Sequence, residues 1–349
     1  MYSETDLQSA VAAGAITPEA ADALRSHISA LRNAPLADEE QFRLITSFND
    51  IFVSIAAILF LVGCAWAGGS FAPWLGAALV TISAWGMAEF FTARRRMALP
   101  SILLLMAFVG GSFATTLLIL IPQGYVDGSN RTGMALAALS AAISAGSAWL
   151  HWRRFHVPIT IAAGVGAITG VGLSLLAAAL PVFDSHILYP ALLIAGLLIF
   201  GFAMYWDLSD RDRKTRRADV AFWLHLLAAP MIVHPIFAML GITRGDASPA
   251  VAALVLAIYL ALGAVALVID RRALMVSALA YVLAAMGTLF REFGAVSLNV
   301  AITALLIGSA LLLLSAFWHN VRAYLVALLP EGMQSRLPPA ANLIPQPAS

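Results

Sequence analysis

The chain has 349 residues, of which 61% are hydrophobic and 11% are charged, whereas about a quarter of the residues of a soluble domain are charged. Its formal net charge at pH 7 is +1, and its single cysteine, Cys64, excludes a disulfide framework or a paired-cysteine metal site. This composition predicts an integral membrane protein whose partner is the lipid bilayer, and it argues against nucleic-acid binding.

Residues 1–33 are predicted to form a small cytoplasmic helical hairpin. Thr5 and Gln8 are spaced as a capping box, and Gly14 can close the first helix. Thr17 is a good N-cap for a second helix. Because two such short helices are marginal alone, we expect the hairpin to bind another surface, either a protein partner or a second copy in a homo-oligomer.

A linker and interfacial lead-in, residues 34–50, precede a transmembrane domain over residues 51–318. Ten apolar runs, each of about twenty residues, are long enough to cross a bilayer. Their approximate limits are 51–69, 71–92, 98–121, 132–151, 157–180, 186–206, 219–241, 248–269, 273–290 and 295–318. Residues 319–349 then form a cytoplasmic amphipathic and proline-rich tail. The predicted fold class is therefore all-α: a polytopic bundle of about ten spans.

The distribution of basic residues predicts the orientation of these spans. Of the 20 lysines and arginines, all but Arg131, Arg244 and Arg291 fall on one side of the ten-span arrangement. Cytoplasmic segments carry such an excess of positive charge, so both termini are predicted to be cytoplasmic. Residues 207–217 mix three acids with five bases, so they can meet anionic lipid headgroups, although a solvated loop on that side is the preferred interpretation.

The seventh run, residues 219–241, carries two histidines and two prolines and is the best candidate for a functional site. Pro230 removes a helical hydrogen bond and can leave polar backbone available beside His225 and His234. The histidines are nine residues apart, about 13 Å along a helix, so they do not share a metal ion unaided. The competing interpretation is that both are neutral and bonded to neighbouring Ser, Thr or Asn299 side chains.

Acidic residues at the ends of the spans receive a plainer interpretation. Asp50, Asp219 and Asp270 are expected at the membrane interface. Glu89 lies a little over a turn inside Arg94, so it can snorkel to the surface or pair with the basic cluster there, or contribute to a substrate site. Substrate-site candidates are therefore His225, Pro230, His234, Asn299 and Glu89.

The segment DLQSAVAAGAITPEAADAL, Asp6 to Leu24, resembles the start of a family of uncharacterised bacterial membrane proteins. Members of this family begin with a short G-x-I-T-x-x-x-A hairpin before a multi-pass region. The resemblance implies a bacterial inner (cytoplasmic) membrane location and supplies no catalytic residue, metal or cofactor.

Two functions from different classes remain open. The first is transporter-like handling of a small neutral or amphipathic solute near the seventh span, with two five-span inverted halves as one possible architecture. The second is a non-catalytic scaffold or assembly factor that acts through residues 1–33. The sequence has no catalytic motif, so an enzyme that uses His225 or His234 as a general base ranks third.

Overall fold

The computed structural model describes residues 4–31, 48–120, 131–210, 215–240, 249–271, 308–309, 317–334 and 337. Every regular element in these ranges is a helix. The chain divides into two units, one of residues 1–42 with 341–349 and one of residues 43–340.

The first unit contains two short helices, α1 (Glu4–Ala12) and α2 (Pro18–Leu31). Gly14 follows α1 with a φ of +69°, in the left-handed region where glycine avoids a steric penalty. At the start of α2, the Thr17 hydroxyl oxygen accepts a hydrogen bond of 3.2 Å from the backbone N–H of Ala20. The cap satisfies one of the backbone donors that a helix start leaves without a partner.

In the second unit, seven helices among the described residues are long and apolar enough to cross a membrane. They are α3 (Phe48–Gly69), α4 (Pro73–Phe91), α5 (Ala98–Leu120), α6 (Arg131–Phe155), α7 (Ile159–Ala179), α8 (Ser185–Leu208) and α9 (Arg216–Met239). Helices satisfy their backbone hydrogen bonds internally, which the bilayer interior demands. The protein is thus a multi-pass membrane protein.

These helices coincide with the first seven predicted spans. The eighth predicted span corresponds to α10 (Pro249–Ile269), an apolar helix of 21 residues. The last two predicted spans, 273–290 and 295–318, lie almost entirely outside the described residues. Two further helices follow, α13 (Trp318–Ala327) and α14 (Glu331–Gln334).

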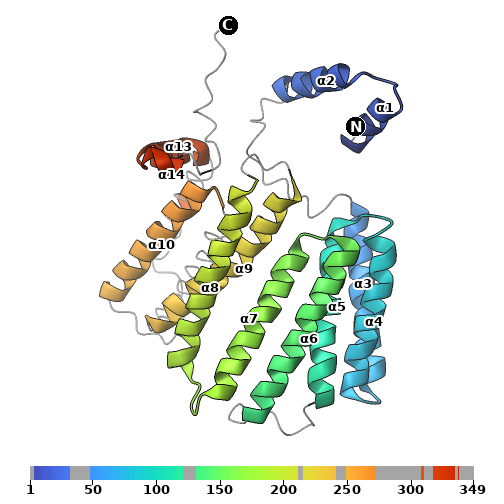
Figure 1. The fold of residues 1–349 in the computed structure, drawn as a ribbon, viewed down its shortest axis with the longest axis vertical. Helices are drawn as coiled ribbons and strands as arrows, with labels where there is room; N and C mark the ends of the chain where they lie inside the picture. Colours follow the sequence, from blue (N-terminus) through green and yellow to red (C-terminus); the bar gives the residue numbers. More distant parts are fainter. Residues whose placement is uncertain are drawn as a thin grey trace, which may run out of the picture. The chain divides into compact units, whose positions relative to one another are not determined.

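The spans pack largely in chain order, as Figure 1 shows for α3 to α7. Helix α9 departs from this order because it packs against both α8 and α7. It is also the most enclosed span: 56% of its membrane-length window is buried, against 17–28% for the other six. A larger share of the side chains on α9 than on the other six helices is therefore shielded from lipid and water.

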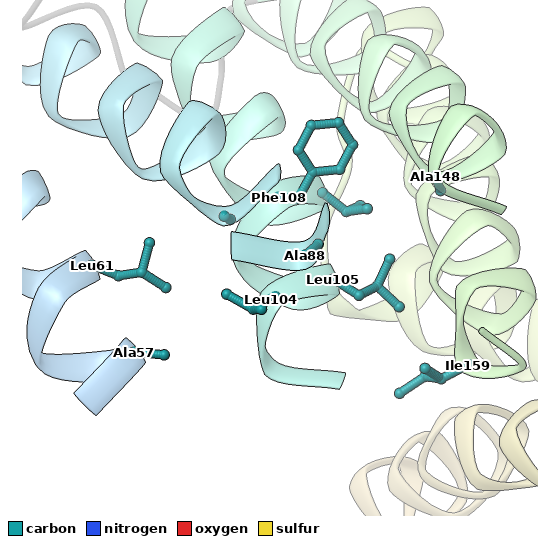
Figure 2. Close-up of a cluster of buried hydrophobic side chains, with 10 residues drawn as sticks. Ala57, Leu61, Ala88, Leu104, Leu105, Phe108, Ala148 and Ile159 are labelled. Atoms are coloured by element: carbon teal, nitrogen blue, oxygen red, sulfur yellow. The ribbon is translucent and has the colours of Figure 1, made fainter. Parts of the chain in front are cut away.

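A cluster of buried apolar side chains has members on each of the five helices from α3 through α7. Leu104, Leu105 and Phe108 of α5 lie at its centre, with small residues such as Ala88 of α4 and Ala148 of α6 against them (Figure 2). Lipid tails are as apolar as leucine, so this packing is stabilised mainly by close contact between side chains. Alanines at the contacts allow the helix backbones to approach.

Glycine makes the closest approach of α8 to α9 possible. A Cβ atom added to Gly196 would lie 2.9 Å from the backbone carbonyl carbon of Met231 and 2.9 Å from Cγ1 of Ile232. A Cβ added to Gly166 of α7 would meet only the end of the Leu227 side chain, at 3.8 Å. Of these two positions, Gly196 at the α8–α9 contact is therefore the one where an added methyl group would disturb the packing.

We expect Gly196→Ala to destabilise the protein by about 1–3 kcal/mol, because α8 and α9 must move apart. Gly166→Ala is the matched control, and we expect it to be neutral or to stabilise α7 by up to about 1 kcal/mol through its higher helix propensity. Unfolding midpoints in detergent micelles measure both. Equal midpoints for the two variants would contradict the close contact at Gly196.

Candidate functional site

The candidate site begins in the last turn of α8, where Asp207 is 4% exposed. A carboxylate near a helix C-terminus meets the negative end of the helix dipole, so its burial there requires compensating partners. A second acid links the two helix ends: Asp210 Oδ2 accepts hydrogen bonds from the backbone N–H (2.9 Å) and the hydroxyl (2.6 Å) of Thr215. Thr215 in turn caps the start of α9.

The principal partner of Asp207 is Arg271, which is 2% exposed and follows α10. Asp270 has a φ of +56° and ends α10 in a left-handed turn. The backbone N–H of Arg271 then bonds to the carbonyl of Ala266 at 2.9 Å, which closes the helix end as a Schellman motif. The guanidinium donates to both carboxylate oxygens of Asp207, through Nε at 3.1 Å and through Nη2, and to the Ala218 carbonyl at 3.2 Å.

His225 completes the cluster from α9. It is fully buried, and its Nε2 lies 2.9 Å from Oδ2 of Asp207. Because a carboxylate only accepts hydrogen bonds, Nε2 carries the proton and donates it to Asp207. The ring of Phe200 on α8 packs edge-on against the imidazole, with the ring centroids 5.2 Å apart.

Asp207, His225 and Arg271 thus form one buried ionic cluster that joins α8, α9 and the end of α10. With a neutral imidazole, the carboxylate and the guanidinium balance each other. Removing such groups from water is costly, and the cost is offset only when the geometry is good and the remaining polar atoms are bonded. Among the described residues, no group of three potential ligands lies close enough to hold a metal ion.

The structure separates the residues that the sequence analysis grouped on the seventh span. His225 is in the ionic cluster, where its Nε2 is bonded to the aspartate carboxylate of Asp207. His234 is half-buried, and its ring lies edge-on to Tyr189 with centroids 5.7 Å apart. Pro230 is exposed within the described part of the chain, and α9 continues through it. Asn299 lies outside the described residues.

Glu89 pairs at the ends of α4 and α6, not at the ionic cluster. It receives two hydrogen bonds from Arg154, from Nε at 2.9 Å and from Nη2 at 2.6 Å. Its observed partner is therefore Arg154 and not the basic cluster at Arg94. Arg94 is five residues after Glu89, a spacing that on a helix turns the two side chains about 140° apart. Arg154 instead faces Glu89 from the neighbouring span. Both side chains of this pair are substantially exposed.

A second buried cluster lies beside the first. The Trp318 indole N–H donates a 2.8 Å hydrogen bond to Asp270 Oδ1, and Nε of Arg322 lies 3.7 Å from the same oxygen. Trp318, Arg322 and Asp270 are each less than 10% exposed. Asp270, expected as an interfacial acid, is therefore the residue that docks α13 against the end of α10.

Sequence reasoning missed two of the three residues in the ionic cluster. The interpretation of residues 207–217 as a solvated loop is wrong for Asp207, which belongs to α8 and is buried. The available signal was an acid directly after an apolar run, where the helix dipole disfavours it. Arg271 was considered only as one of the basic residues that predict the orientation of the spans in the membrane.

The chain was compared with family models, curated proteins and solved structures. None of the three comparisons found a match.

Proposed function

We propose that the protein is a transporter-like membrane protein that moves a small neutral or amphipathic solute along α9. The observation that supports this most is the Asp207–His225–Arg271 cluster on the most enclosed span. Ionisable residues within membrane spans are rare because they are costly, and they commonly mark substrate or ion pathways.

The proposal includes a topology and a location. The proposed protein has about ten spans. Both termini and the helices of residues 1–33 lie in the cytoplasm of a bacterium, and the bundle lies in its inner membrane. The unequal distribution of lysine and arginine supports the orientation. The resemblance of Asp6 to Leu24 to bacterial membrane proteins supports the location.

The cluster is better suited to holding helices together than to binding a charged solute. Asp207 and Arg271 already satisfy each other, and His225 is fully enclosed. Beyond the cluster, α9 offers the half-buried His234 and the carbonyls of Leu226 and Met231, whose usual donors are replaced by Pro230 and Pro235. These neutral groups favour a neutral or amphipathic solute.

In this mechanism the ionic cluster is a closed gate at the predicted cytoplasmic ends of α8, α9 and α10. Separating Asp207 from Arg271 frees the end of α10 from α8 and α9 and gives water a path toward His234. Alternating access in transporters commonly involves such rocking of one group of helices against another.

Access of water to α9 tests the proposal. Single cysteines at Met231 and at His234 are placed in a Cys64→Ala background, and membrane-impermeant thiol reagents are applied from each side in turn. We expect labelling at these positions, and we expect Asp207→Asn to increase labelling from the cytoplasmic side because it weakens the gate. A cysteine at Leu198, a 70% exposed position on α8, is the lipid-facing control and should stay unlabelled.

Absence of labelling from both sides, with and without Asp207→Asn, would contradict a solute path along α9. It would favour the alternative function, a non-catalytic scaffold or assembly factor. One observation favours that alternative independently: residues 1–42 belong to a separate unit, and α2 leaves Leu24 37% exposed for contact with a partner or a second copy.

A further inference from the structure

The ends of α4 and α6 bring five arginines to one edge of the bundle. Arg94, Arg95 and Arg96 follow α4, and Arg153 and Arg154 lie in the last turn of α6. The bidentate pair between Glu89 and Arg154 shows that these two helix ends lie next to each other. We call Arg94, Arg95, Arg96 and Arg153 the arginine patch.

The arginine patch is exposed and lacks acidic partners among the described residues. Glu89, the acid at the end of α4, is already bound by Arg154. Partial negative charge at the C-terminal ends of α4 and α6 favours cations at this position, which stabilises the patch without neutralising it. An anion that reaches this edge therefore meets exposed guanidinium groups for which the described part of the chain supplies no carboxylate partner.

Two of these guanidinium groups lie against the outer, apolar surface of the spans. The Arg95 guanidinium carbon is 5.5 Å from the ring centroid of Phe90, and that of Arg153 is 5.1 Å from the ring centroid of Trp149. Phe90 is 42% exposed and Trp149 is 59% exposed, so in a membrane these rings face lipid. Both arginines thus fold back along the helices rather than extend into water.

This arrangement matches the boundary between lipid tails and headgroups. The rings contact the apolar part of a lipid while the guanidinium groups reach its phosphate, with which arginine forms paired, charge-assisted hydrogen bonds. We propose that the arginine patch binds anionic phospholipid headgroups. This inference requires only that the protein spans a membrane, so it is independent of the transport proposal.

The exposed pair Arg216 and Arg217, at the start of α9, provides a comparison. These residues belong to the same predicted face of the membrane, yet neither is among the arginines stacked on an aromatic ring in the described residues. A general attraction between positive charge and anionic membranes would involve both groups equally. Specific lipid binding would depend on the arginine patch.

The test uses the purified full-length protein in a neutral detergent, with binding of phosphatidylglycerol and phosphatidylcholine measured by native mass spectrometry. The double variant Arg95→Gln/Arg153→Gln removes the two stacked charges, and Arg216→Gln/Arg217→Gln is the matched control. We expect the wild type and the control to prefer phosphatidylglycerol. Each lost arginine should weaken that binding about fivefold, or about 25-fold for the first double variant.

Three outcomes would overturn the proposal: unchanged phosphatidylglycerol binding by the Arg95/Arg153 variant, an equal loss in the control, or an equal affinity for both lipids in the wild type. Inorganic phosphate is added as a competitor. Displacement of the lipid at comparable concentrations would show that the patch recognises phosphate alone, which also contradicts lipid binding. Unfolding midpoints, which should match wild type because all four positions are exposed, report on folding.

Discussion

Asp207→Ala is expected to destabilise the protein by about 3–5 kcal/mol. The substitution removes the carboxylate that accepts two hydrogen bonds from the Arg271 guanidinium, which is 2% exposed, and it removes the acceptor of His225 Nε2. Breaking a buried ion pair by removing one partner costs this much because the remaining charge cannot regain its hydration. The unfolding midpoint in detergent micelles measures the loss.

Glu89→Ala is the matched control, because it also removes a carboxylate that forms a bidentate pair with an arginine. The side chains of Arg154 and Glu89 are 52% and 36% exposed, so solvent replaces the lost interaction. We expect a cost of about 1 kcal/mol or less. If Asp207→Ala costs no more than Glu89→Ala, the cluster is hydrated and is not the buried site described above.

The spans were predictable because the bilayer imposes their length and composition. Each of α3 to α9 falls within a few residues of a predicted run. The largest difference is at the end of α6, which continues to Phe155 because Arg153 and Arg154 suit the C-terminal end of a helix and do not terminate it. Hydropathy alone excludes such charged final turns from a span.

Of the three residues in the ionic cluster, only His225 was predictable. His225 stood out because it is an ionisable residue in an apolar run, but its partners depend on how α8 and α9 pack, which periodicity does not specify. The direction of Arg271 depends on the left-handed turn at Asp270. Glycine is the usual residue at that position of a helix end, and aspartate is only occasionally tolerated there. No local signal therefore pointed from Arg271 toward Asp207.

Replacing the entire ionic cluster should separate its role in stability from its role in function. The triple variant Asp207→Leu/His225→Leu/Arg271→Met removes all three ionisable groups of the cluster together, and the new side chains are apolar. Such replacements of buried ion pairs are often neutral or stabilise a protein by about 1–4 kcal/mol. We therefore expect the unfolding midpoint of the triple variant to equal or exceed that of the wild type, well above that of Asp207→Ala.

The same variant should lose the proposed gate movement. An apolar contact between α8, α9 and the end of α10 has no charged groups for water to rehydrate, so the closed arrangement gains stability relative to an open one. Labelling of a cysteine at His234 from the cytoplasmic side should then fall below the wild-type level, opposite to the increase expected for Asp207→Asn. A triple variant that is as stable as the wild type and labels equally well would show that the cluster serves packing rather than a gate.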